Sequence, residues 1–287
     1  MNKKHIAKFL GLPTAILAVS TASILIKLSN ANGITIAFYR TFIASIFLIA
    51  LIPYKKIEIN RLIRKDYLNI ILSGLFLGLH FGFWVTSLKF TTVASSVVLV
   101  TSHPLLVTYY TKKHTETKFD KKIYIAILTA IIGISIMTLP EIRMSKTKII
   151  GDLLAILGMI SMAGYLINGR RTRKRVSART YITLVYLVAS ITLFIFSLKL
   201  GNIFKVFPIK EYFIFIGLAL IPTLIGHSIY NWSLGYLKPD LVSLSLLGEP
   251  IVASLLAMII LLEIPTKYTI TGGIITLIGI YLSLKYR

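Results

Sequence analysis

Arg40, His103 and Glu249 are ionisable residues that stand inside long apolar stretches of the sequence, where a charge is costly. A carboxyl group in such surroundings is either protonated or paired. Glu249 could therefore carry a coupling proton, bind an amine, or pair with a basic group such as Arg40. His103 titrates near neutrality and is the second candidate proton carrier. Arg40 could anchor a carboxylate, but it lies only about six residues from the end of its stretch, so snorkelling or a structural ion pair is an equal alternative.

The stretch at residues 67–88 carries glycines on one face and polar residues on another. Gly74, Gly78 and Gly82 recur every four residues, a spacing that lets a second helix approach closely. The polar residues are Ser73, His80, Trp84 and Ser87. At about 100° per residue they cluster on roughly the opposite face, which we expect to line a cavity. Alternatively, the tryptophan is an interfacial aromatic residue and the histidine a hydrogen-bonded packing residue.

A similar polar stripe occurs in the stretch at residues 212–234. Its members are Thr223, His227, Tyr230 and Asn231. Spacings of three and four residues place them on one helical face, although the tyrosine and asparagine could instead bond to neighbouring helices. Pro222 should loosen the helix one turn earlier and free carbonyl groups that a cavity or a side chain must satisfy.

Two proline-containing stretches complete the set of candidate binding residues. In 92–111, Ser96 shares a face with His103, and in 240–262, Glu249 lies four residues after Ser245. The candidates for contact with a small molecule are thus Arg40, His80, Trp84, Ser87, Ser96, His103, His227, Tyr230, Asn231 and Glu249. Of these, Glu249 and His103 are the candidates for proton coupling.

Ten apolar stretches, each close to the roughly 20 residues of a membrane-spanning helix, follow one another along the 287-residue chain. They cover residues 9–28, 34–52, 67–88, 92–111, 122–139, 151–169, 180–199, 212–234, 240–262 and 268–284. Hydrophobic residues make up 56% of the chain and its mean hydropathy is +0.81, whereas a soluble domain holds about 45–50% apolar residues. The sequence therefore predicts an all-α membrane protein with ten transmembrane helices. The first stretch also has features of a cleaved signal peptide, but its counterpart in the second half favours a span.

The basic residues, which give a formal net charge of +22, lie mostly in alternate loops. With the N-terminus in the cytoplasm, 22 of the 32 lysines and arginines fall on the cytoplasmic side and nine on the outer side, as the positive-inside rule requires. We therefore expect a multi-pass protein of the inner (cytoplasmic) membrane with both termini in the cytoplasm. The run Arg170–Arg175 could be a nucleic-acid patch, but it is more simply a topology anchor that meets anionic lipid, and we expect no nucleic-acid partner.

The second half of the chain repeats the first at an offset of 146 residues. Pro104 aligns with Pro250, Lys121 with Lys267, and Ile132-Gly133-Ile134 with Ile278-Gly279-Ile280. Two leucine-rich halves resemble each other by composition alone, but prolines and glycines are punctuation rather than bulk hydrophobes. Five spans in each half would place two copies, residues 1–146 and 147–287, in opposite orientations. Inverted repeats around a midplane site are a design of transporters that work by alternating access.

Several short motifs follow one another in a fixed order over nearly the whole chain. They are Phe38-Tyr39-Arg40, Ser87-Leu88-Lys89-Phe90, Ser233-Leu234-Gly235-Tyr236, Gly248-Glu249-Pro250, and Leu262-Glu263-Ile264-Pro265 followed by Gly272-Gly273. In these motifs the chain resembles the drug/metabolite transporter superfamily, specifically its EamA-type permeases. The resemblance implies a ten-helix bundle, a central cavity lined mainly by spans three, four, eight and nine, and export of amino acids or other small metabolites. The first half departs from the pattern, because Ser102-His103-Pro104 stands where the second half has Gly248-Glu249-Pro250.

The expected function is a secondary-active or facilitative transporter that exports amino acids or similar small metabolites by alternating access. Its expected partners are a small-molecule substrate, protons as a candidate coupling ion, and the bilayer with its anionic lipids; a monomer is compatible with the sequence. The alternative is a non-transporting membrane scaffold or a receptor-like protein, which would not need matched polar stripes in both halves. The chain has no cysteine and only scattered histidines, and it has no Walker loop. We therefore expect no enzyme, no metal and no cofactor.

Overall fold

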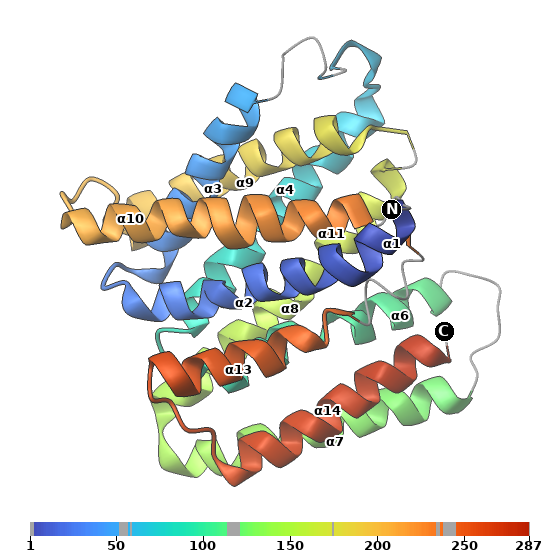
Figure 1. Ribbon diagram of the computed structural model, residues 1–287, viewed down its shortest axis with the longest axis vertical. Coiled ribbons are helices and arrows are strands. Elements are labelled where there is room, and N and C mark those ends of the chain that lie inside the picture. The colour runs from blue at the N-terminus through green and yellow to red at the C-terminus, as the bar shows by residue number, and fades with distance from the viewer. Residues whose placement is uncertain are drawn as a thin grey trace.

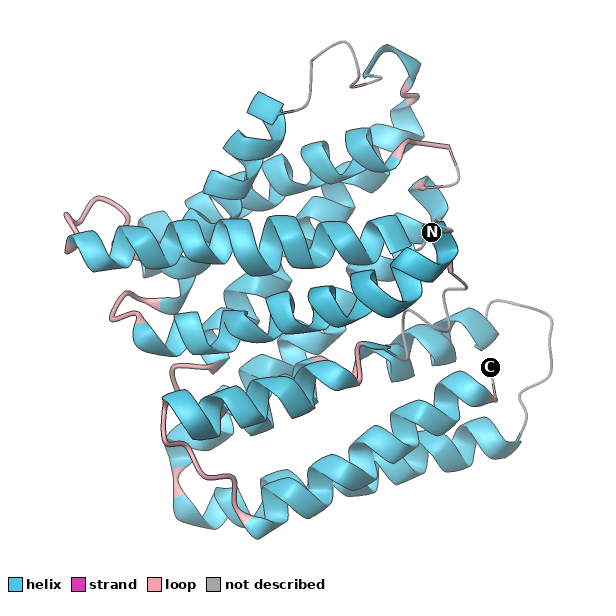
Figure 2. Ribbon diagram, viewed as in Figure 1, coloured by secondary structure: helices cyan, strands magenta, loops and turns pink. Residues whose placement is uncertain are grey.

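A computed structural model describes residues 3–51, 57, 59–113, 121–173, 175–233, 236–237 and 245–286. Helices and short connecting loops make up these ranges, which contain no strand (Figure 2). The predicted all-α class is therefore confirmed. Parts of the predicted topology fall outside the described residues, namely Lys55, Lys56, Lys118, Lys174, Lys238 and the beginning of the ninth stretch at 240–244.

Each of the ten apolar stretches is mostly helical where the structure describes it (Figure 1). The helices of the first half are α1 (Lys3–Ile6), η1 (Ala7–Gly11), α2 (Leu12–Leu28), α3 (Gly33–Leu51), η3 (Ile59–Arg61), α4 (Arg64–Ser87), α5 (Val93–Val100), α6 (His103–Lys113) and α7 (Lys121–Met144). Those of the second half are α8 (Lys146–Thr172), α9 (Ala178–Leu200), α10 (Ile209–Leu218), η4 (Ala219–His227), α11 (Ser228–Ser233), α13 (Gly248–Ile260) and α14 (Lys267–Lys285).

Six helical segments in the described ranges are long and apolar enough to cross a membrane. They are Ala7–Leu28, Gly33–Leu51, Arg64–Ser87, Lys146–Gly169, Ala178–Leu200 and Ile209–Tyr230. Two further apolar helices, Val93–Val107 and Gly248–Ile260, are shorter. The chain is thus a multi-pass membrane protein, while the count of ten crossings stays a prediction.

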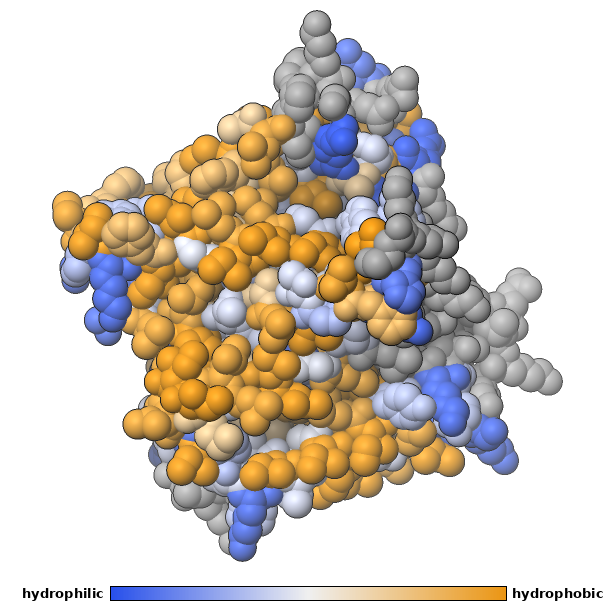
Figure 3. Space-filling view, in the orientation of Figure 1, coloured by the Kyte–Doolittle hydropathy of each residue, from blue (hydrophilic) through white to orange (hydrophobic). Residues whose placement is uncertain are grey.

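The outer surface of the bundle is apolar where lipid tails would meet it. Leu128, Ile195 and Ile259, for example, expose 58%, 58% and 70% of their surface. On a soluble protein, exposed hydrophobic residues are normally scattered singly and do not occur in such numbers. Figure 3 shows hydrophobic side chains over the middle of one face and hydrophilic side chains at its edges. This arrangement matches a bundle whose middle lies in hydrocarbon and whose ends lie in water.

The two halves pack against each other through reciprocal pairs of helices. α7 and α14, the last helix of each half, lie side by side and run in opposite directions (Figure 1). α2 of the first half packs on η4 of the second, and its counterpart α8 packs on α4 of the first. In the same way α2 packs on α13, and α8 packs on α5 and α6. α3 packs on η4 as α9 packs on α4. Each of these contacts therefore has a counterpart with the halves exchanged.

The glycine face of α4 packs on α9, as the four-residue spacing predicts. A methyl group on Gly74 would lie 3.0 Å from the carbonyl oxygen of Val185, and one on Gly78 would lie 3.1 Å from that of Ala189. Gly82 faces the same helix. Because a side chain would push the backbones apart, these positions fix how closely α4 approaches α9, and the opposite face of α4 is left to face the interior.

Neighbouring glycines of α14 provide a matched test of this kind of packing. A Cβ on Gly272 would lie 2.5 Å from the Gly133 carbonyl oxygen and 2.7 Å from the Met137 amide nitrogen, both on α7, whereas a Cβ on Gly273 would meet only the Val98 side chain, at 3.7 Å. We expect Gly272→Ala to destabilise the protein by about 1–3 kcal/mol through overpacking. Gly273→Ala is the control and should leave the apparent melting temperature in detergent unchanged or slightly raised. Equal melting temperatures for the two variants would contradict the close α7–α14 contact.

Candidate functional site

A cavity of about 200 Å³ lies among helices of both halves. Its polar or aromatic lining comes from Arg40, His80, Trp84, Thr101, His103, Tyr165, Tyr186, His227, Tyr230 and Glu249. Its apolar lining comes from Val19, Ala22, Leu77, Val100, Pro104, Val107, Met162, Leu166 and Leu246. Sites for drug-sized ligands measure roughly 300–1,000 Å³, so this cavity fits a smaller molecule.

Many lining residues occur in pairs separated by 146 positions, the offset of the internal repeat. The pairs are Val19 with Tyr165, Arg40 with Tyr186, Trp84 with Tyr230, Val100 with Leu246, and His103 with Glu249. The two halves therefore supply equivalent positions to one cavity, although the side chains at these positions differ.

Seven of the ten residues predicted from the sequence line this cavity; they are Arg40, His80, Trp84, His103, His227, Tyr230 and Glu249. Ser87 and Ser96 lie elsewhere, because their hydroxyl groups are buried and bond to each other at 2.6 Å. The backbone of Asn231 belongs to α11, but its side chain lies outside the described part of the structure.

Sequence reasoning did not single out Tyr165 and Tyr186, which come from the sixth and seventh stretches. The chain has 15 tyrosines, so residue type alone did not distinguish these two. The signal that could have found Tyr186 is its position, 146 residues after Arg40. Spans three, four, eight and nine still supply most of the lining, and α2, α3, α8 and α9 supply the rest.

Arg40 on α3 is held inside the bundle with an exposed fraction of only 1%. Its Nε atom donates a hydrogen bond of 2.6 Å to the hydroxyl group of Thr223. Its guanidinium carbon lies 4.3 Å from the centre of the Phe81 ring and 5.7 Å from that of the Trp84 ring. The aromatic faces stabilise the buried cation, and so the guanidinium is fixed in position at the cavity wall.

Thr223 can hold Arg40 because the regular α-helical hydrogen bonding around it is interrupted. Pro222 has no N–H group, which leaves the carbonyl of Leu218 without its usual donor. The Thr223 hydroxyl donates to this carbonyl oxygen at 2.8 Å, and the segment Ala219–His227 winds as a π-helix. The predicted loosening before Pro222 is thus confirmed, and one hydroxyl group serves both the freed carbonyl and the arginine.

The fourth stretch, expected as one helix, is two helices with a turn at Thr101 and Ser102 between them. Pro104 removes the donor for the carbonyl of Val100, four residues earlier. The Nδ1 atom of His103 lies 3.1 Å from this carbonyl oxygen. Since a carbonyl only accepts, Nδ1 carries the proton, which leaves Nε2 as the atom that can accept one.

Glu249 lies at an equivalent break in the second half. It belongs to the first turn of α13, after a turn at Leu246 and Leu247 and directly before Pro250, and its amide donates to the Leu246 carbonyl at 3.1 Å. A carboxylate is stabilised at the positive end of a helix. Within the described residues Glu249 is not within ion-pair distance of Arg40, although both line the cavity.

His80 and Trp84 form one side of the cavity together. The Nδ1 atom of His80 bonds to the Gly158 carbonyl oxygen on α8 at 2.9 Å, and its ring stacks on that of Trp84 at 6.0 Å between centres. His80 is therefore both a hydrogen-bonded packing residue and a lining residue, so the two interpretations of this position are compatible.

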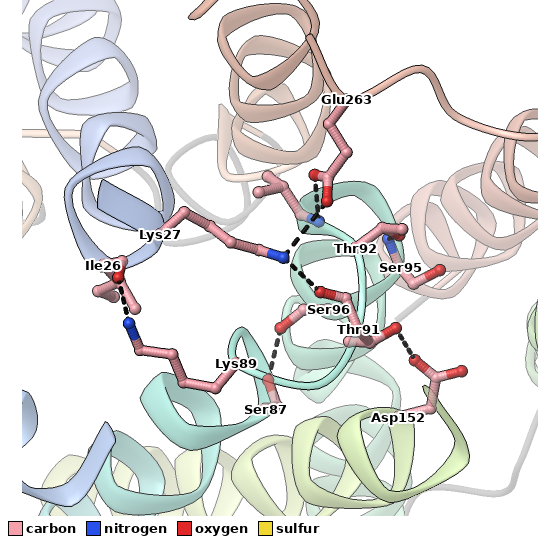
Figure 4. Close-up of polar contacts among 11 residues, drawn as sticks. Ile26, Lys27, Ser87, Lys89, Thr91, Thr92, Ser95, Ser96, Asp152 and Glu263 are labelled. Atoms are coloured by element: carbon pink, nitrogen blue, oxygen red, sulfur yellow. Dashed lines mark hydrogen bonds and ion pairs between the residues drawn. The ribbon is translucent and has the colours of Figure 1, made fainter. Parts of the chain in front are cut away.

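At one end of the bundle, beyond the cavity, polar side chains join four segments that are far apart in the sequence (Figure 4). The Nζ atom of Lys27, in the last turn of α2, lies 3.3 Å from Oε1 of Glu263 and 2.8 Å from the Thr91 carbonyl oxygen. The other carboxylate oxygen of Glu263 accepts from the Val93 amide at 2.8 Å and so caps the first turn of α5. The Thr91 hydroxyl donates to Asp152 of α8 at 2.8 Å.

Lys89 and Glu211 extend this set of contacts. The Nζ atom of Lys89 donates to the carbonyl oxygens of Ile26 and Ser29, at 2.8 and 2.6 Å, and so caps the end of α2. The Glu211 carboxylate accepts from the Ser29 hydroxyl and, at 2.8 Å, from the backbone N–H of Asn30. Burial lowers the pKa of Lys89 to about 8, and the negative charge of Glu211 opposes this shift. Lys27, Lys89, Thr91, Asp152, Glu211 and Glu263 are called the end cluster below.

The bond between Thr223 and Arg40 can be tested by an isosteric change. Thr223→Val keeps the shape but removes the hydroxyl group, so that both Nε of Arg40 and the Leu218 carbonyl lose a partner, at about 1–3 kcal/mol for each orphaned group. We expect a clearly lower apparent melting temperature in detergent. Thr223→Ser retains the hydroxyl group and should remain within a few degrees of the unmodified protein; equal stability of the valine variant would show that the bond contributes little.

Comparison with known proteins places this architecture in a family. The sequence model of the EamA-like transporter family matches residues 7–139 and, separately, residues 149–285. A protein of Archaeoglobus fulgidus described as an uncharacterized transporter is 25% identical over 98% of this chain and 97% of its own length.

A second relative and a solved structure are also similar to this chain. The Bacillus subtilis protein YyaM, also described as an uncharacterized transporter, is 25% identical over 83% of this chain and 79% of its own length. A solved crystal structure superposes with a TM-score of 0.66 over 98% of both chains at 18% identity, which shows a common fold. Because the family model covers most of both halves, the chain belongs to the EamA-like transporter family and is a membrane transporter.

Proposed function

We propose that the protein is a secondary-active or facilitative transporter that moves amino acids or similar small metabolites across the membrane by alternating access. The observation that carries this proposal is the cavity whose lining residues pair at 146 positions apart, such as Arg40 with Tyr186 and His103 with Glu249. A cavity built from equivalent positions of two halves is what a pair of rocking repeats requires.

The proposal includes two inverted repeats, residues 1–146 and 147–287, that together make ten membrane crossings. The reciprocal contacts of α2 with η4 and of α8 with α4 support it. So does the family model, which matches each half once. In Figure 1, α7 and its counterpart α14 run in opposite directions, as inverted copies should.

The proposed orientation puts both termini in the cytoplasm, in the inner membrane. Both chain ends lie at the same end of the bundle in Figure 1, opposite the loop between α13 and α14. The strongly basic loops of the sequence belong to the same side as the termini if all ten helices cross, and anionic lipid headgroups would meet them there. The end cluster would then face the outside of the cell.

The end cluster supports alternating access because it ties together parts of both halves. Lys27 lies at the end of α2 in the first half, and Glu263 follows α13 in the second. In this conformation the ion pair joins the two halves at that end, and alternating access requires it to separate when the cavity opens there.

Transport itself is tested with the purified protein in liposomes. We expect flux of at least some members of a panel of labelled amino acids, with and without a pH gradient, above that of empty liposomes. The absence of flux for every compound, with a protein that is folded by its melting curve, would contradict the proposal. Vesicles of known orientation would identify export, the direction that the family resemblance implies.

In the same assay Glu249→Gln identifies the coupling site. If Glu249 carries a coupled proton, the variant should lose the stimulation of flux by the pH gradient, because an amide does not titrate. Glu263→Gln, the same substitution at the end cluster, is the matched control and should keep the stimulation whatever it does to the rate. Stimulation that persists in Glu249→Gln would leave His103 as the candidate.

Opening of the end cluster is accessible to cross-linking because the chain has no native cysteine. In the double variant Lys27→Cys with Glu263→Cys, a short bifunctional thiol reagent should join α2 to the segment after α13 and stop most of the flux. Each single variant, treated with the same reagent, should keep its flux. Full flux after complete cross-linking would show that this end does not open during transport.

A further inference from the structure

Two buried N–H donors at the cavity wall have no hydrogen-bond acceptor within the described residues. They are Nη1 of Arg40 and Nε1 of Trp84. Their residues are 1% and 5% exposed, and both line the cavity. The guanidinium carbon lies 5.7 Å from the centre of the tryptophan ring, so the two donors belong to one small region of the wall.

A buried donor without an acceptor is unfavourable, and it is more so when the group is charged. An arginine stays protonated in proteins and therefore needs an acceptor rather than a neutral state. Its Nε atom already has the Thr223 hydroxyl, and its flat face already lies on Phe81. What the region lacks is an anionic group able to accept from both N–H donors.

The acidic residue that lines the cavity together with Arg40 is Glu249, which lies on α13 of the other half. Since the two charged groups line the same cavity without forming a direct ion pair among the described residues, a ligand with two charges of opposite sign can satisfy both. A ligand with only an anion would require Glu249 to be protonated, and one with only an amine would leave the guanidinium unmatched.

We infer that the cavity selects a zwitterion whose carboxylate binds Nη1 of Arg40 and Nε1 of Trp84 and whose ammonium group binds Glu249. This inference rests on the proposed transport function and gives the substrate an orientation within it. A carboxylate has two oxygens and can accept from both donors at once. The side chain of the ligand then meets the apolar wall, which includes Leu77, Val100 and Met162, and the small volume limits it to the size of a single amino acid.

The role of Glu249 as a binding group is compatible with a role in proton coupling. One carboxylate can hold either a proton or an ammonium group, but it cannot hold both in the same position. The carboxylate of the ligand therefore depends on Arg40 and Trp84 alone, and these two residues carry the distinctive part of the inference.

Binding can be measured by tryptophan fluorescence, because the chain has only two tryptophans. Trp232→Phe leaves Trp84 as the only reporter; Trp232 is 40% exposed and is no part of the cavity lining. The probes are alanine, leucine and phenylalanine, their amides, which lack the carboxylate, and their deaminated acids, which lack the ammonium group. We expect the amino acid that binds best to bind at least about 30-fold more tightly than its amide, the factor that corresponds to about 2 kcal/mol for a buried charged contact.

Substitutions then separate the two ends of the ligand. Arg40→Gln should lower the affinity for the amino acid by about 30-fold or more and leave that for the amide within about threefold, which abolishes the preference. Glu249→Gln should keep the preference for acid over amide but lose the preference for the amino acid over its deaminated acid. Trp84→Phe keeps an aromatic ring without the N–H donor and should weaken binding less, by about three- to tenfold, as measured by the ligand-induced rise in melting temperature.

The outcomes separate this inference from the transport function. Amide and amino acid that bind equally, or an Arg40→Gln variant that keeps the preference, would overturn the inference while flux of the same compounds in liposomes would leave the transporter intact. Absence of binding by all amino acids tested would also overturn it. If Arg40→Gln does not fold, Trp84→Phe still decides, because a fall of the acid preference by about three- to tenfold on removal of one N–H group supports the inference and an unchanged preference overturns it.

Discussion

The burial of one guanidinium group governs the interior of this bundle. Arg40 is 1% exposed, and a guanidinium at such depth needs a hydrogen-bond acceptor, a polarisable surface and a counter-charge nearby. Thr223 is available as a partner because Pro222 interrupts its helix. Phe81 is available as a surface because the glycine face of α4 lies close to α9 and turns the other face of α4 inward. The helix break, the close helix pair and the cavity can thus be seen as parts of one solution to the cost of this charge.

The two halves contribute residues 146 positions apart to the same cavity, but the chemistry of the paired residues differs. His103 and Glu249 lie 146 residues apart, each directly before a proline. The His103 ring bonds to the Val100 carbonyl, whereas the backbone amide of Glu249 bonds to the Leu246 carbonyl. The cation of the cavity, Arg40, comes from the first half and its carboxylate from the second. A relative movement of the halves would therefore change the distance between the two charges, which links the charge pattern of the cavity to its conformation.

Much of the fold follows from the sequence alone, because apolar length, glycine spacing and proline position act locally. The helical stretches, the glycine face of α4 and the loosened backbone at Pro222 could all be predicted. Ser87 and Ser96 could not be placed, since helical phase gives a direction but not the neighbour in that direction, which here is the other serine. Tyr186 was missed for the converse reason, because an isolated tyrosine in an apolar helix has no local signature. Lys27 and Lys89 are, from the sequence, two of the nine basic residues expected on the outer side, and their contacts depend on segments more than 60 residues away.

The end cluster has a consequence for the role of solvent. Its lysines and glutamates cap helix ends of other segments, so that separating them leaves carbonyl groups of α2 and the first amide of α5 without partners. In a dry environment each loss would be unfavourable, but water can replace such partners at little cost. In the proposed transport cycle, opening at this end therefore requires wetting, because water must take the place of the partners that these helix-end groups lose.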